Sequence, residues 1–169
     1  MKSMHKVDSY PIDLVVTWVD GTDPLWQKAR AKWASVEGDN REVRFRDWDL
    51  MRYWFRGVEK FMPWIRYVHF ITWGHVPAWL KCSYEKIHIV KHEDYIPQEY
   101  LPTFSSHTIE WNFHRIEGLS EHFIYSNDDM FAIHSLNRED FFQHGLPRHC
   151  AIQTLAPFRE NGITHIIGR

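Results

Sequence analysis

The sequence predicts one α/β domain in which a mainly parallel sheet is covered by helices on both faces. Three observations support this prediction: the chain has 169 residues, predicted strands and helices alternate along it, and its first strand is almost continuously apolar. A chain of this length can bury the core of one domain. Alternating strands and helices are typical of parallel sheets, and continuously apolar strands are typical of sheets buried on both faces. We therefore treat residues 1–169 as a single domain.

The first strand and helix are predicted near the N-terminus. Residues 12–18 form an apolar run, broken only by Asp13, that predicts a buried strand. A helix should extend over residues 24–36, because Asp23 is a suitable N-cap and a proline follows it at the first helical position.

The strongest helix is predicted for residues 47–62, where large apolar side chains recur at intervals of three and four residues. Asp47 and Asp49 would lie in its first turn, where the helix dipole favours anions. Residues 66–72 follow with alternating side chains and predict a second strand.

The second half of the chain predicts two more strands and two more helices. The strands are residues 87–90 and 122–126, and the helices are residues 105–116 and 137–144. Gly145 is expected to end the last helix.

Charge and composition exclude several classes of protein. The chain has 20 Lys and Arg against 22 Asp and Glu, so it lacks the basic excess that nucleic-acid binding by general electrostatics requires. No run approaches the roughly 18 apolar residues of a membrane span. Two cysteines cannot build a disulfide framework, so we expect a reduced, cytoplasmic protein. The nine Trp can build the core and the twelve His can lie on the surface. Alternatively, some of them line a site for a flat, polar ligand such as a sugar or a base.

Two acidic turns follow predicted strands, at residues 20–23 and 127–129. Ligands of open α/β sheets bind beyond the carboxyl ends of the strands. In the second turn, Asp128 and Asp129 can hold Mg²⁺, whose octahedron a substrate phosphate usually completes. Successive side chains point to opposite faces, so we expect one carboxylate in the site and the other bracing a neighbouring loop. The alternative is an ordinary acidic turn.

The first turn is a candidate nucleotide contact. A base can rest near the backbone that ends the strand at Thr17, Trp18 and Val19, while the carboxylate of Asp20 reaches a ribose hydroxyl before Gly21. The alternative is a tight Asp-Gly turn. The chain has neither a GxGxxG nor a GxxxxGK[ST] motif.

Two further groups of side chains can contribute. Arg46 and Arg52, with a third arginine nearby, can clamp a diphosphate, although a surface ion pair between Asp49 and Arg52 explains the pattern equally well. His107 shares a predicted helix face with Trp111 and can act as a base, or it is a structural hydrogen bonder.

Several ordered motifs resemble the Stealth family of sugar-1-phosphate transferases of capsule and exopolysaccharide synthesis. They are IDLVVTWVDGTDP, RFRDWDLMRYWFRGVEKFMPWIRYVHFITWGHVPAWL, IVKHEDYIP, LPTFSSHTIEWNFHRI and GLSEHFIYSNDDMF, and together they span about residues 12–145. The motifs are most similar to those of bacterial polysaccharide phosphotransferases. The family also includes an animal N-acetylglucosamine-1-phosphotransferase.

The resemblance implies a Rossmann-like sheet similar to that of nucleotide-sugar transferases. It implies a UDP-N-acetylhexosamine or UDP-hexose donor, whose β-phosphorus is attacked by a hydroxyl of an oligosaccharide or polysaccharide acceptor, with release of UMP and with Mg²⁺ as the cofactor. The expected catalytic residues are Asp128, Asp129, His107 and Arg52, of which the two aspartates would hold the metal. The expected donor-binding residues are Thr17, Trp18, Val19, Asp20, Gly21, Arg46, Asp49, Asn112 and Arg115.

Two alternatives stay open: a glycosyltransferase with the same donor, and a non-catalytic fragment that binds nucleotide sugars. Members of the family continue into two further blocks, whereas this chain ends at Arg169. We therefore expect a truncated piece that exposes apolar side chains such as Ile163, Ile166 and Ile167 and self-associates. A lipid-linked acceptor would bring the protein to the inner face of the membrane as a peripheral protein.

Overall fold

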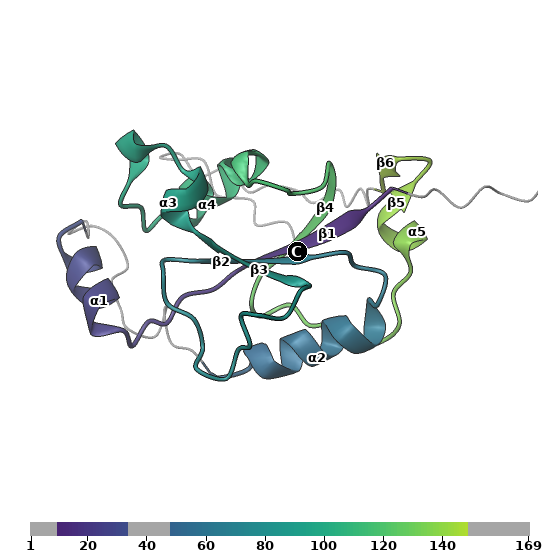
Figure 1. Ribbon diagram of the computed structural model, residues 1–169, viewed down its shortest axis with the longest axis horizontal. Coiled ribbons are helices and arrows are strands. Elements are labelled where there is room, and N and C mark those ends of the chain that lie inside the picture. The colour runs from purple at the N-terminus through teal and green to yellow at the C-terminus, as the bar shows by residue number, and fades with distance from the viewer. Residues whose placement is uncertain (1–9, 34–47, 149–169) are drawn as a thin grey trace, which may run out of the picture.

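A four-stranded parallel sheet forms the centre of the protein (Figure 1). The computed structural model describes residues 10–33 and 48–148. The strands lie side by side in the order β3-β2-β1-β4, and each neighbouring pair is parallel. They are β1 (Ile12–Thr17), β2 (Val68–Thr72), β3 (Ile87–Lys91) and β4 (His122–Ser126).

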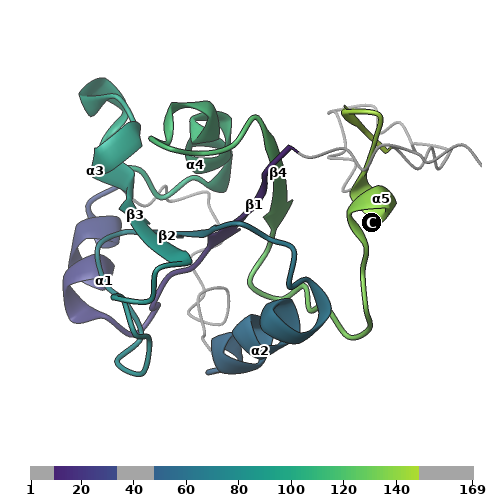
Figure 2. The same ribbon diagram turned by 45° about the vertical axis from the view of Figure 1, so that its right-hand side comes forward.

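Helices cover both faces of this sheet, as the sequence predicts. Figures 1 and 2 show α2 (Met51–Phe61) below the sheet, and α3 (His92–Tyr95) and α4 (Ser106–Trp111) above it. Single 3₁₀ turns at Gln98–Tyr100 and Phe113–Arg115 flank α4. Helix α1 (Pro24–Ala31) lies beyond the carboxyl ends of the strands.

The opposite end of the sheet carries a small separate motif. It comprises α5 (Arg138–Phe141) and a two-stranded antiparallel hairpin of β5 (Phe142–Gln143) and β6 (Leu146–Pro147). None of the helices within residues 10–33 and 48–148 combines the length and apolar character that crossing a membrane requires.

Two apolar cores result, one on each face of the sheet. Leu14 and Val16 pack toward α2, where Trp54 is 1% exposed, whereas Val15 packs toward Phe113 on the other face. This alternation follows from the two-residue period of a strand. The predicted apolar stripe of α2 is confirmed, since it buries Met51, Trp54 and Val58.

Two helices are shorter than predicted. Helix α1 ends at Ala31, and the rest of its expected span beyond residue 33 lies outside the described residues. Helix α2 begins at Met51 because Asp49 has a φ of 54°, in the left-handed region, which interrupts a right-handed helix. Asp49 therefore precedes the helix and is not in its first turn.

The other two predicted helices are interrupted or replaced. The helix expected at residues 105–116 stops at Trp111, where Asn112 adopts ψ 0° and its side-chain amide donates to the carbonyl of Thr108 at 2.8 Å. The helix expected at residues 137–144 is a single turn followed by the hairpin. Gly145, with φ 76°, lies in the turn of that hairpin instead of ending a helix.

A buried carboxylate joins the amino ends of the strands. Asp13 of β1 is fully buried and receives two bonds from Arg66, with Nε to Oδ1 at 2.8 Å and Nη2 to Oδ2 at 2.6 Å. The backbone N–H of Ser120 donates to Oδ2 at 2.8 Å, and Nε2 of His69 lies 3.2 Å from it. Burial alone would raise the pKa of Asp13, but the hydrogen bonds from Arg66, His69 and Ser120 together hold it well below its ordinary value.

Replacement of this carboxylate by an amide should be strongly destabilising. Asp13→Asn leaves Arg66 facing an amide that has one acceptor oxygen, so we expect a loss of about 3 kcal/mol of unfolding free energy at pH 7. Because the pKa of Asp13 is lowered on folding, its contribution is present above the ordinary value of 3.8 and is lost as the pH falls below it.

Urea denaturation between pH 7 and pH 3 measures both effects. The difference in stability between the wild type and Asp13→Asn should begin to narrow below pH 3.8, while the exposed control Glu117→Gln should follow the wild type throughout. A constant difference between the wild type and Asp13→Asn over this range would contradict the argument.

Candidate functional site

A cleft of about 240 Å³ opens at the carboxyl ends of the strands. The chain leaves β1 toward β2 and β3 on one side, and β4 lies on the other, so the point at which the strand order reverses lies between β1 and β4. Ligands of open α/β sheets bind at such a point. The residues that line the cleft come from several elements: Thr17, Trp18, Val19, Trp26, Ile71, His92, Thr103, Phe104, Ser106, Ile109 and Asp128.

A larger groove of about 500 Å³ lies elsewhere, between α2 and the segment that joins β2 to β3. Its lining is mainly apolar, and none of the predicted site residues within the described part of the chain belongs to it. The smaller cleft at the strand ends is therefore the better candidate for the functional site.

Two aromatic side chains form walls of the cleft. Trp26 of α1 is 5% exposed, and its ring meets that of Phe104 edge to face, with centroids 6.0 Å apart. Asp23 places Trp26 by capping α1, because Oδ1 accepts from the backbone N–H groups of Leu25 at 2.7 Å and Trp26 at 3.1 Å. These bonds confirm the predicted N-cap. The bond from Trp26, followed by those from Leu25 and His75, lowers the pKa of Asp23.

His75 fixes the turn between β1 and α1 from another part of the chain. The backbone N–H of Asp20 donates to Nε2 of His75 at 2.8 Å, so Nε2 carries no proton. Nδ1 then carries it and donates to Oδ2 of Asp23 at 3.1 Å. His75 is thus a neutral bridge between the two ends of the turn, and the sequence alone did not single it out.

Asp20 stabilises its own turn through one carboxylate oxygen. Oδ1 accepts from the backbone N–H of Thr22 at 2.8 Å and from its hydroxyl at 2.6 Å. Gly21 is buried, and its carbonyl accepts from the side-chain amide of Gln27 at 2.8 Å. The contact between Asp20 and a ribose hydroxyl stays a prediction, with Oδ2 as the oxygen that such a hydroxyl would meet.

A short chain of hydroxyl groups links the floor of the cleft to α4. The hydroxyl of Tyr125 donates to Glu110 at 3.1 Å and lies 3.4 Å from Oγ1 of Thr17. Since the Tyr125 proton goes to Glu110, the hydroxyl of Thr17 is the donor in the second contact. Burial chiefly raises the pKa of Tyr125 to about 12, so this residue stays neutral.

The acidic turn after β4 places its two carboxylates differently. Both side chains are exposed, but Asp128 lines the cleft and Asp129 is not part of the lining. The expectation that one carboxylate serves the site while the other braces a neighbouring loop stays a prediction. A backbone bond from Met130 to Asn127 at 3.2 Å closes the turn.

A magnesium ion would depend on few protein ligands at this site. Among residues 10–33 and 48–148, no group of three or more His, Cys, Asp or Glu side chains is placed to hold a metal ion. The carboxylate of Asp128 at the edge of the cleft fits the usual magnesium site, in which one or two carboxylates are completed by water and substrate phosphates.

Of the predicted residues, the cleft brings together Thr17, Trp18, Val19 and Asp128. His107 is exposed on α4, next to Ser106 of the lining, and Arg115 is exposed beyond the end of that helix. Asn112 is bonded to Thr108, as described above. The roles proposed for these residues stay predictions.

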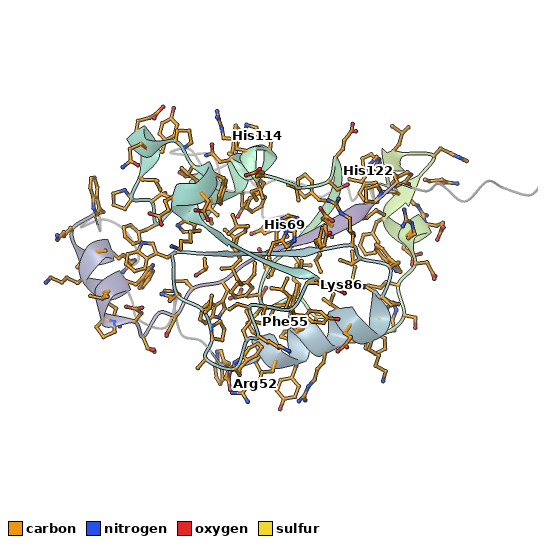
Figure 3. The ribbon with its side chains drawn as sticks, in the orientation of Figure 1. Arg52, Phe55, His69, Lys86, His114 and His122 are labelled. Atoms are coloured by element: carbon orange, nitrogen blue, oxygen red, sulfur yellow. The ribbon has the colours of Figure 1, made fainter. Side chains whose placement is uncertain are left out.

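Arg52 lies on the outer side of α2, across the sheet from His69 and His114 (Figure 3). It pairs with Asp49 at 3.3 Å, with both side chains largely exposed, and its guanidinium lies 5.4 Å from the centre of the Trp79 ring. The surface ion pair considered as the alternative is therefore present, and neither Arg52 nor Asp49 lines the cleft. Arg46 lies outside the described residues, as do Ile163, Ile166 and Ile167.

Helix α2 holds the segment that follows the acidic turn. A Cβ atom at Gly57 would lie 2.7 Å from the carbonyl oxygen of Ala132, so only glycine permits this approach. The backbone N–H of Leu136 donates to the carbonyl of Phe61 at 3.0 Å, and the indole N–H of Trp64 donates to the carbonyl of Leu136 at 2.7 Å. The segment that follows Asp128 is therefore held against α2.

Comparison with known families gives a direct match. Residues 10–35 match the model of Stealth protein CR1, conserved region 1, and residues 44–149 match that of Stealth protein CR2, conserved region 2. The chain belongs to the Stealth family.

Curated relatives of this Stealth chain include three bacterial phosphotransferases. The chain is 51% identical over 153 residues to the capsular polysaccharide phosphotransferase WcwK of Streptococcus pneumoniae, covering 88% of this chain and 46% of the relative. It is 46% identical to the receptor polysaccharide phosphotransferase WefC of Streptococcus oralis (88% and 47% covered) and 44% identical to the exopolysaccharide phosphotransferase cps2G of Lactiplantibacillus plantarum (85% and 43% covered). The chain spans about half the length of the curated relatives it matches.

Gly57→Ala should destabilise this Stealth chain, although alanine is the better helix former. In an open helix, this change adds about 1 kcal/mol of stability. Here the new methyl group would collide with the carbonyl of Ala132, and we expect a net loss of about 1–3 kcal/mol.

Urea denaturation measures this loss, with Arg56→Ala on the exposed side of α2 as the matched control. NMR spectra should also show shifted backbone amides at residues 127–132 in Gly57→Ala only. If Gly57→Ala proved as stable as the control, the contact with Ala132 would not constrain this helix.

Proposed function

We propose that this chain is the donor-binding part of a transferase that moves a sugar-1-phosphate from a UDP-sugar to an acceptor hydroxyl in polysaccharide synthesis. The observation that carries the proposal is the cleft at the point of strand-order reversal, with aromatic walls from Trp26 and Phe104 and the carboxylate of Asp128 at its edge. Membership of the Stealth family and the names of the curated relatives support the same chemistry.

The donor would be a UDP-N-acetylhexosamine or a UDP-hexose, and the acceptor a hydroxyl of an oligosaccharide or polysaccharide. The aromatic walls suit a flat base, and the backbone of Trp18 and Val19 lies beside it at the end of β1. The diphosphate would then extend toward Asp128, whose carboxylate would hold an Mg²⁺ ion that neutralises its charge. An acceptor carried on a lipid would bring the protein to the inner face of the membrane.

The reaction is a substitution at phosphorus. The acceptor oxygen bonds to the β-phosphorus, and the bond from this phosphorus to the bridging oxygen breaks, so that UMP leaves with the bridging oxygen. The bond between the sugar and its phosphate oxygen stays intact. Such chemistry depends mainly on positioning and charge neutralisation. His107, beside the cleft on α4, is the proposed base for the proton of the acceptor, and Arg46 is proposed to contact the diphosphate.

The nucleotide product separates this proposal from its alternatives. The chain is incubated with candidate UDP-sugars, an oligosaccharide acceptor and Mg²⁺, and the products are identified by mass spectrometry. Release of UMP with a phosphodiester-linked sugar supports the proposal, whereas release of UDP indicates a glycosyltransferase. Binding of UDP-sugar without turnover, in a reaction that a full-length relative completes, indicates a fragment that only binds the donor.

Single substitutions in the acidic turn should show which of its two carboxylates contributes to donor binding. Asp128→Asn is expected to weaken binding of UDP-sugar in Mg²⁺ by about tenfold, or about 1.4 kcal/mol, because an amide is a poor magnesium ligand. Asp129→Asn is the matched control and should change affinity less, since Asp129 lies outside the lining of the cleft.

Isothermal titration calorimetry with and without Mg²⁺ measures both variants. The difference between the wild type and Asp128→Asn should disappear when the metal is removed. Equal affinities of the wild type and both variants in Mg²⁺ would rule out metal binding by this turn.

A further inference from the structure

His92 brings a polar ring into the wall of the cleft at the end of β3. It is the first residue of α3, and it lines the cleft together with Trp26, Phe104 and Thr103. These neighbours are largely apolar, so the ring of His92 is one of few polar groups that this part of the cleft can offer a ligand. His92 lies within the motif IVKHEDYIP, but it is not among the catalytic or donor-binding residues that the sequence analysis expects.

The two ring nitrogens of His92 have different surroundings. Nδ1 is enclosed by protein and has no hydrogen-bond partner. Nε2 is not enclosed in this way, and within residues 10–33 and 48–148 it makes no hydrogen bond. Burial chiefly lowers the pKa of His92 to about 4, so the ring is neutral at neutral pH.

The enclosure of Nδ1 selects one tautomer of the neutral ring. A buried N–H without an acceptor is rarer in proteins than a buried acceptor without a donor. The proton therefore lies on Nε2, and His92 presents a neutral N–H donor to the ligand. A neutral donor suits a carbonyl oxygen, whereas the charge of a diphosphate calls for a cation.

We infer that His92 determines specificity for the base of the donor, by donating a hydrogen bond from Nε2 to a carbonyl oxygen of uracil. The inference rests on the proposed function and adds to it a contact for the nucleotide. The aromatic walls beside His92 support a flat base at this position. A base with an amino group at this position would place two N–H donors opposite each other. Its binding would be weakened, because neither donor would have an acceptor.

The test compares the affinities of UMP and UDP-N-acetylglucosamine for the wild type, His92→Phe and His92→Gln. Phenylalanine keeps the ring and removes the donor, so both ligands should bind about tenfold more weakly, which corresponds to about 1.4 kcal/mol. Glutamine keeps an N–H donor and should lose less. The matched control is His88→Phe, since His88 is a half-buried histidine of β3 outside the lining of the cleft.

Thermal denaturation and NMR complete the test. His92→Phe removes an unpaired buried nitrogen, so its melting temperature should not fall. The ¹⁵N shifts of the His92 ring should show the proton on Nε2 in the wild type, and the Nε2 signal should move when UMP is added. If His92→Phe did not fold, the comparison with His92→Gln and the NMR titration would still decide.

The possible failures are distinguishable. Unchanged affinity for UMP with weaker binding of UDP-N-acetylglucosamine would place His92 against the sugar and overturn the contact with the base. Unchanged affinity for both ligands in both variants would show that His92 lines the cleft without contributing to binding, and would overturn the inference. A wild-type chain that binds neither UMP nor the UDP-sugar would overturn the proposed function together with this inference.

Discussion

Strand β1 is buried on both faces and hydrogen-bonded along both edges, and this burial is the constraint on which the rest of the structure depends. A strand in that position tolerates a charge only if the protein supplies its partners. Asp13 meets the condition through Arg66, His69 and the N–H of Ser120, which joins β1 to β2 and to the segment before β4. The amino end of the sheet is fixed in this way, and the cleft opens at the opposite, carboxyl end of the strands.

Much of this architecture could be predicted from the sequence. The four strands, the stripe of α2 and the N-cap at Asp23 follow from local periodicity and capping chemistry, and all are present. The errors arose where a single residue or a tertiary contact overrides the local pattern. Asp49 adopts a left-handed conformation that no periodicity signals, and Asn112 uses its side chain to end a helix whose apolar pattern continues.

The candidate site was predictable only in part, for a similar reason. Thr17 ends β1 and Asp128 lies just after β4, and the ends of strands can be located from sequence. His75 acts on Asp20 from 55 residues away along the chain, and the importance of His92 depends on what encloses one of its nitrogens. Such relations are properties of the folded chain. The twelve histidines of the sequence gave no means of separating these two from the rest.

The position of the cleft also bears on when it can form during folding. Strands β1 and β2 are closer in the sequence than β1 and β4 are, and the bond from Ser120 to Asp13 spans 107 residues. Closing so long a loop costs more entropy, so pairing of β4 with β1 is expected to come late. The cleft exists only after that step. A ligand that occupies it would bind the completed sheet alone and, by mass action, would stabilise the last strand to join.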